Sequence, residues 1–136
     1  MSKKIIGCVI DDDQIYLFGV SRLIEIHRLC DALLIYKNGH EALEAFKAML
    51  EHQEALPDVI MLDLNMPVMD GWEFLDEFVK IKNKADKKIT IYIVSSSINP
   101  KEIERAKSIS DVSDYIVKPV TAEKLKEIFT AEAGEN

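Results

Sequence analysis

The chain has 136 residues, which suits one compact domain. Its apolar fraction of 48% is enough to build a core, and its net charge of −7 disfavours binding to nucleic-acid phosphates or to anionic membrane surfaces. No apolar run approaches the length of a membrane span, and the two cysteines lack the spacing of a zinc site, so we expect reduced thiols in a cytoplasmic protein.

Short apolar runs rich in β-branched residues alternate along the chain with amphipathic stretches of helical length. The runs predict strands that are buried on both faces. Apolar residues three or four positions apart predict a helix after each strand, the fourth over about residues 100–109 and the fifth from Thr121. Asp70, with Glu73 three residues on, has the spacing of a capping box at the start of the third helix. The predicted strands cover residues 5–10, 32–36, 59–62, 89–94 and 115–117.

Five strand–helix units in alternation predict an α/β fold with a parallel sheet covered on both faces. The count favours a flavodoxin-like (βα)5 doubly wound arrangement with strand order 2-1-3-4-5. We expect a single domain over residues 1–136, with its core at about 4–132 and no output domain. In such sheets the ligand site lies at the carboxyl ends of the strands, so residues directly after each strand should carry the chemistry.

Polar residues follow four of the five predicted strands: Asp11 to Asp13, Asp63, Ser95 to Ser97, and Lys118. Carboxylates at the ends of adjacent strands, about 5 Å apart, must share one pocket, where two charges repel by roughly 3 kcal/mol at a dielectric constant near 20. One lysine cannot neutralise three acids, so oxygen ligands of this kind predict Mg²⁺ or Mn²⁺. With a lysine and a hydroxyl nearby, the set predicts phosphoryl transfer with Asp63 as the nucleophile.

Four motifs, taken together and in order, resemble the response-regulator receiver family of two-component signalling over essentially the whole chain. The likeness is to chemotaxis-type receivers. The motifs are the acid pair Asp11-Asp12, the Asp63 segment with Asn65, Met66, Pro67, Asp70 and Gly71, then Ser95, and finally the run from Asp114 to Pro119.

The resemblance implies a role for each residue of the acidic pocket. Asp63 would accept a phosphoryl group from a histidine kinase or a phosphotransfer histidine protein. Asp12, Asp63 and the backbone carbonyl of Asn65 would bind Mg²⁺ directly, with Asp11 acting mainly through water. Lys118 would pair with the phosphoryl group or with unmodified Asp63, and the bond from Lys118 to Pro119 would be cis.

Further positions would carry the signal out of the pocket. Ser95 takes the switch-hydroxyl position and Tyr115 the aromatic switch position, where the ring rotates into space that Ser95 vacates. Asn65 and Ser97 border the phosphoryl group and would influence its lifetime. A downstream protein would bind the face formed by the fourth helix, fifth strand and fifth helix. In this chain the turn before that strand, residues 108–113, departs from the usual small-residue pattern of the family.

Two other functions compete with this interpretation. A haloacid-dehalogenase-type phosphohydrolase also begins with a strand and an acidic loop, but it needs an acid pair downstream of its lysine, and nothing after Lys118 supplies one. A degenerate receiver that only binds partners would not need the complete acidic set. We therefore expect a phosphorylation switch rather than an enzyme, as a monomer or weak dimer that either relays its phosphoryl group or binds a target.

Overall fold

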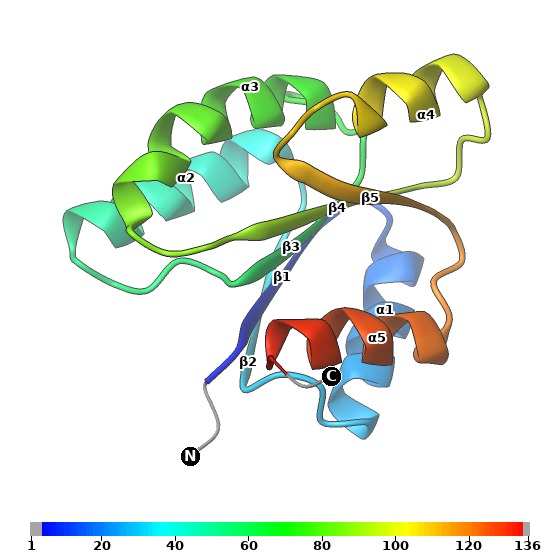
Figure 1. The fold of residues 1–136 in the computed structure, drawn as a ribbon, viewed down its shortest axis with the longest axis horizontal. Helices are drawn as coiled ribbons and strands as arrows, with labels where there is room; N and C mark the ends of the chain where they lie inside the picture. The colour runs from blue at the N-terminus through cyan, green and yellow to red at the C-terminus, as the bar shows by residue number, and fades with distance from the viewer. Residues whose placement is uncertain (1–3, 135–136) are drawn as a thin grey trace.

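The structure is a computed structural model that describes residues 4–134. Residues 1–3 and 135–136 of the predicted domain lie outside the described part. Five parallel strands form one sheet in the order β2-β1-β3-β4-β5, and five α-helices connect and cover them (Figure 1). The predicted α/β fold and its strand order are therefore confirmed.

The elements alternate as predicted. The strands are β1 (Ile6–Ile10), β2 (Ala32–Tyr36), β3 (Val59–Leu62), β4 (Thr90–Ser95) and β5 (Val112–Val117). The helices are α1 (Gln14–Ile26), α2 (Gly39–Glu51), α3 (Gly71–Lys82), α4 (Pro100–Lys107) and α5 (Ala122–Glu132), with one 3-10 turn, η1 (Asn83–Ala85), after α3.

The sheet separates two apolar cores, because successive side chains of a strand point to opposite faces. α2, α3 and α4 pack on one face around Phe46, Phe74 and Phe78, whose rings contact one another. α1 and α5 cover the other face, as Figure 1 shows, and enclose a core that includes Val20 and Leu125. Every residue of the central strand β3 is buried, which explains why it appears in the sequence as an uninterrupted apolar run.

Two boundaries differ from the prediction by more than one residue, for identifiable reasons. β5 begins at Val112, three residues earlier than predicted, because this edge strand opens with the polar residues Ser113 and Asp114 and lacks an apolar run there. α4 ends at Lys107 rather than at 109, and Ser108 caps it by donating its hydroxyl to the Arg105 carbonyl. Within residues 4–134, no helix is long and apolar enough to cross a membrane.

Two carboxylates fix the beginning of β1, at the sheet edge opposite the predicted site. Asp31 accepts a hydrogen bond from the Ile5 amide at 2.6 Å, and Asp58 accepts one from the Ile6 amide at 2.8 Å. Asp58 is buried and also pairs with the Lys87 ammonium at 2.9 Å. These contacts fix the position of β1 along its neighbours, and with it the position of the acids that follow its carboxyl end.

Candidate functional site

The carboxyl ends of β1, β3 and β5 bring the predicted polar residues together. Asp11 and Asp12 follow β1, Asp63 follows β3, and Lys118 follows β5. The Asp63 amide donates to the Ile10 carbonyl at 2.9 Å, which carries the pairing of β1 and β3 one residue beyond the strands. The backbone therefore aligns the two acidic segments side by side.

Three carboxylates converge in this pocket. Each of Asp11, Asp12 and Asp63 offers an oxygen, and the three oxygens lie within 4.8 Å of one another. Asp11 and Asp63 are buried, whereas Asp12 is exposed at the rim. Carboxylate oxygens at a site open to solvent are the ligands that Mg²⁺ prefers, so this donor set fits the predicted ion.

Lys118 is the cation that reaches these acids. Its ammonium lies 2.8 Å from Asp11 Oδ2 and 3.9 Å from Asp63 Oδ2, so the stronger contact is with Asp11. The ammonium also lies over the ring of Tyr16, 4.3 Å from its centroid. The bond between Lys118 and Pro119 is cis, as the resemblance implied.

The acidic pocket raises the pKa of both buried carboxyl groups. Burial is the main cause of the raised pKa of Asp63, which reaches about 6, and repulsion from Asp11 adds to it. Lys118 and the backbone amides of Leu64 and Asn65 offset part of this effect. Burial likewise raises the pKa of Asp11, although the hydrogen bond from Lys118 opposes the shift. A cation bound beside these carboxylates would favour their ionised forms and so oppose the rise in pKa.

The loop after β3 is held close to the α3 N-terminus. A Cβ on Gly71 would lie 2.5 Å from the Asp63 carbonyl oxygen, so a side chain cannot fit at this position without moving backbone. The Gly71 amide donates to the Leu64 carbonyl at 2.9 Å. Asp70 and Glu73 form the predicted capping box, which fixes the first turn of α3.

The two predicted switch residues lie on neighbouring strands. Ser95 is fully buried as the last residue of β4, and its Oγ accepts from the Ser97 amide at 3.2 Å. The Tyr115 ring is already turned inward: it is 8% exposed, and its hydroxyl donates to the Ser97 carbonyl at 2.9 Å. The rotation of this ring after a movement of Ser95 stays a prediction, and the structure shows the inward position of the ring.

The other candidate residues lie around the same edge. Asn65 is exposed beside Asp63, and its backbone amide faces the Asp63 carboxyl. Ser97 accepts from the Asn99 amide at 3.2 Å and lies 3.4 Å from Glu102, so its side chain helps to begin α4. Asp13 caps α1 by accepting from the amides of residues 15 and 16.

Tyr16, which was not among the predicted site residues, lies beside the acidic pocket. Its ring contacts Lys118, and its buried hydroxyl has no hydrogen-bond partner among the described residues. Burial, and then the charges of Asp11 and Asp63, raise the pKa of this phenol, so it stays protonated. Tyr16 is half-buried in the first turn of α1, where any residue that packs against the sheet could stand. The sequence therefore gives no sign of its contact with Lys118, which is seen only in the structure.

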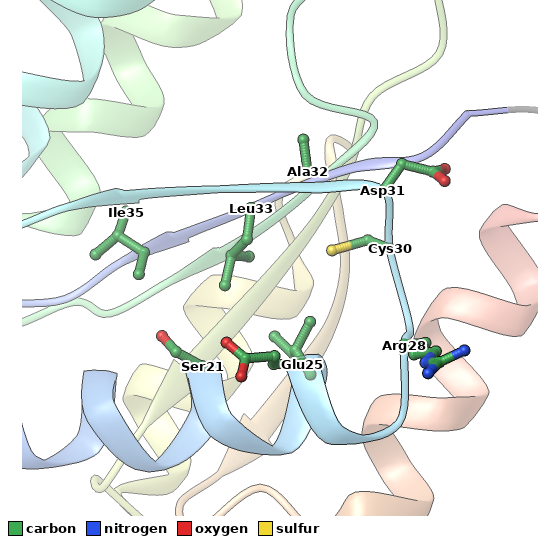
Figure 2. Close-up of a pocket in the computed structure, with 9 residues that line it drawn as sticks. Ser21, Glu25, Arg28, Cys30, Asp31, Ala32, Leu33 and Ile35 are labelled. Carbon is green, nitrogen blue, oxygen red and sulfur yellow. The ribbon is translucent and has the colours of Figure 1, made fainter.

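A groove of about 670 Å³ lies away from the acids, between α1 and the edge strand β2 (Figure 2). Glu25 and Arg28 border it on the helix side, and Cys30, Leu33 and Ile35 on the strand side. Figure 2 shows that Leu33 and Ile35 point toward α1. The acidic residues of the carboxyl edge do not line this groove, so it is separate from the candidate site.

The fold and the site together define a doubly wound α/β domain with an acidic, lysine-containing pocket at the carboxyl ends of its strands. Residues 8–130 match the family model of the response regulator receiver domain. The chain is a member of this receiver family of two-component signalling.

Known relatives agree with this membership. The chain is 36% identical over 94 residues to the sensor histidine kinase CheAY of Helicobacter pylori, an alignment that covers 68% of this chain and 11% of that protein. It is 30% identical over 129 residues to the nitrate/nitrite response regulator NarL of Escherichia coli K12, covering 93% of this chain and 54% of that regulator. A crystal structure of a two-component response regulator from Cytophaga hutchinsonii superposes with a TM-score of 0.85 at 27% identity, covering 98% of this chain and all of that one.

Proposed function

We propose that the protein is a phosphorylation switch in which Asp63 accepts a phosphoryl group from a phosphohistidine of a sensor kinase or phosphotransfer protein. The observation that carries the proposal is the pocket itself. Asp63 lies at the end of the central strand, with two further carboxylates and one ammonium within reach. A buried nucleophile beside a phosphoryl-binding cation is the arrangement that phosphoryl transfer requires.

The chemistry assigned to the pocket is a displacement at phosphorus. A carboxylate oxygen of Asp63 forms the new P–O bond while the P–N bond of the donor histidine breaks, and the released imidazole takes a proton from water. The Leu64 amide holds Asp63 Oδ1 at 2.9 Å and so fixes the orientation of the nucleophile. Lys118 stabilises the charge on the phosphoryl oxygens. Mg²⁺, held by Asp12, Asp63 and the backbone carbonyl of Asn65, with Asp11 acting mainly through water, would neutralise the negative charge of this pocket.

A protein donor finds apolar contacts around the acidic pocket. Three large side chains at the carboxyl edge are strongly exposed: Ile15 is 85% exposed in α1, Val68 80% in the loop after β3, and Ile98 74% in the loop before α4. Exposed apolar groups around a polar pocket are typical of protein-binding sites. They support a donor that is a protein rather than a small molecule alone.

The signal would leave through α4, β5 and α5, where a downstream protein would bind. Ser95 and Tyr115 connect the pocket to this face through their shared contact with Ser97. Phosphorylation would favour the arrangement in which the Tyr115 hydroxyl and Ser95 Oγ both contact the Ser97 backbone, in the loop of residues 96–99 between β4 and α4. We place this signalling in the cytoplasm, because both cysteines are free thiols.

Labelling with a small acyl or amido phosphodonor in the presence of Mg²⁺ tests the proposal. We expect one alkali-labile phosphoryl group on Asp63 and none on a folded Asp63→Asn variant. Asp76→Asn, which removes an exposed acid of α3, is the matched control and should label normally. Labelling of Asp63→Asn at the wild-type level would refute the assignment.

A further inference from the structure

Lys118 is held from two directions in the acidic pocket. Asp11 binds the ammonium at 2.8 Å, and the ring of Tyr16 lies on another side, 4.3 Å from the nitrogen to the ring centroid. The lysine side chain is 16% exposed. An ammonium that is largely removed from water over an aromatic face is attracted by the ring quadrupole.

These contacts connect four residues in a cycle: Lys118, Asp11, Asp13 and Tyr16. Asp11 Oδ2 binds Lys118, and Asp11 Oδ1 accepts from the Asp13 amide at 3.0 Å. Asp13 Oδ1 in turn accepts from the Tyr16 amide at 3.2 Å, as part of the α1 cap. Tyr16 then returns to Lys118 through its ring. The acidic loop, the helix cap and the aromatic face therefore form one unit around the ammonium.

Phosphoryl transfer to Asp63 would require the Lys118 ammonium to change its partner. In the present structure its ammonium is nearer to Asp11 than to Asp63, by 2.8 Å against 3.9 Å. To stabilise a phosphoryl group on Asp63, the ammonium must exchange the Asp11 contact for phosphoryl oxygens. A lysine that loses its ion pair on a flexible stem tends to return to water unless another group holds it.

We propose that Tyr16 is a positioning residue for phosphoryl transfer, whose ring keeps the Lys118 ammonium over the pocket while its ion-pair partner changes. The role rests on the proposed function and adds a residue to it. A neutral ring suits the task because it adds no further charge to the three carboxylates. It also leaves the N–H groups of the ammonium free for oxygen acceptors.

The ring and the hydroxyl can be separated by substitution. Tyr16→Phe keeps the aromatic face, whereas Tyr16→Leu keeps apolar bulk and loses it. Leu23→Ala is the matched control, because Leu23 lies on the same helix and lines the same small groove as Tyr16 and Pro119 but is not among the Lys118 contacts. Each Tyr16 variant is made in the wild-type chain and again with Lys118→Met.

We expect Tyr16→Leu to slow labelling of Asp63 by a small phosphodonor about three- to thirtyfold, the range of a partly desolvated cation–π contact. Tyr16→Phe and Leu23→Ala should stay within about twofold of wild type. In the Lys118→Met background, Tyr16→Leu should cause no further loss, because the ring acts only through the ammonium.

A second readout follows the contact without any reaction. The Lys118 methylene protons next to the ammonium should resonate upfield, shifted by the ring current, in wild type and Tyr16→Phe but not in Tyr16→Leu. Equal slowing by Tyr16→Leu with and without the lysine would overturn the proposal, since the tyrosine would then act on the fold. So would an unshifted Lys118 signal. A wild-type protein that takes no phosphoryl group would instead refute the proposed function, and with it any role of the contact in transfer, even with the shifted signal present.

Discussion

Replacing Asp63 with asparagine should stabilise the metal-free protein at neutral pH. Asp63 is 7% exposed, and burial together with Asp11 raises its pKa from 3.8 to about 6. A carboxyl whose pKa is higher in the folded protein than in the unfolded chain binds its proton more tightly when folded. Its ionisation therefore costs stability, and the cost grows as the pH rises from the unfolded pKa to beyond the folded one.

The size of this cost follows from the shift. A rise of about two pKa units corresponds to about 3 kcal/mol once the carboxyl is fully ionised, near pH 7.5. Near pH 4.5 the folded carboxyl is still protonated, and the cost is only about 1 kcal/mol. The pKa of about 6 already includes the attraction of Lys118, so we expect asparagine to stabilise the protein by about 3 kcal/mol near pH 7.5 and by about 1 kcal/mol near pH 4.5.

Urea unfolding with a chelator present, followed by circular dichroism at the two pH values, measures this difference. Asp76→Asn removes an equal charge from an exposed position and should show no pH-dependent gain. Adding Mg²⁺ should stabilise wild type more than Asp63→Asn, because the variant loses a ligand. A gain of the same size at both pH values, or no gain at all, would refute the electrostatic reasoning.

Three further outcomes are expected at other positions. Asp12→Ala should weaken Mg²⁺ binding about tenfold, and Asp11→Ala less, as measured by fluorescence of the single tryptophan; equal effects would exclude a more direct role for Asp12. Asp58→Ala should lower the free energy of unfolding by about 2–3 kcal/mol, because the Ile6 amide loses its acceptor and Lys87 loses its ion pair, while the labelling rate should stay unchanged. Ser95→Ala should still accept phosphate, but it should lose most of the phosphorylation-dependent chemical-shift change in α4 and α5; a full wild-type response would separate Ser95 from the signal.

The topology and the acidic pocket were predictable because both depend on patterns that repeat along the chain. Buried parallel strands require apolar runs, and the rule that their carboxyl ends meet places Asp11, Asp63 and Lys118 together without knowledge of any side-chain conformation. The capping box of Asp70 and Glu73 was predictable for a similar reason, since a short polar side chain just before a helix accepts hydrogen bonds from the free amides of its first turn. These predictions depend on backbone geometry alone.

The contacts that the sequence did not predict depend on the conformations of long side chains. Lys118 could have pointed to Asp63 rather than lying between Asp11 and the Tyr16 ring, and no spacing distinguishes the two. Trp72 is partly buried, with the Arg105 guanidinium 4.0 Å from the centre of its ring. That contact joins α3 to α4, elements that lie far apart in sequence. Side-chain contacts of this kind are set by tertiary packing rather than by local pattern.

The inward Tyr115 changes how the switch should work. In the structure its hydroxyl donates to the Ser97 carbonyl, and the Ser95 hydroxyl accepts from the Ser97 amide. The new contact that a phosphoryl group can add is a hydrogen bond donated by Ser95 Oγ, which accepts from the Ser97 amide in the described part of the chain. Such a bond to a charged group contributes about 1.5–3 kcal/mol, enough to shift a population ten- to a hundredfold. We therefore expect phosphorylation to restrict the Ser97 loop and the start of α4, so that a partner would recognise how firmly this segment is held rather than a new position of the ring.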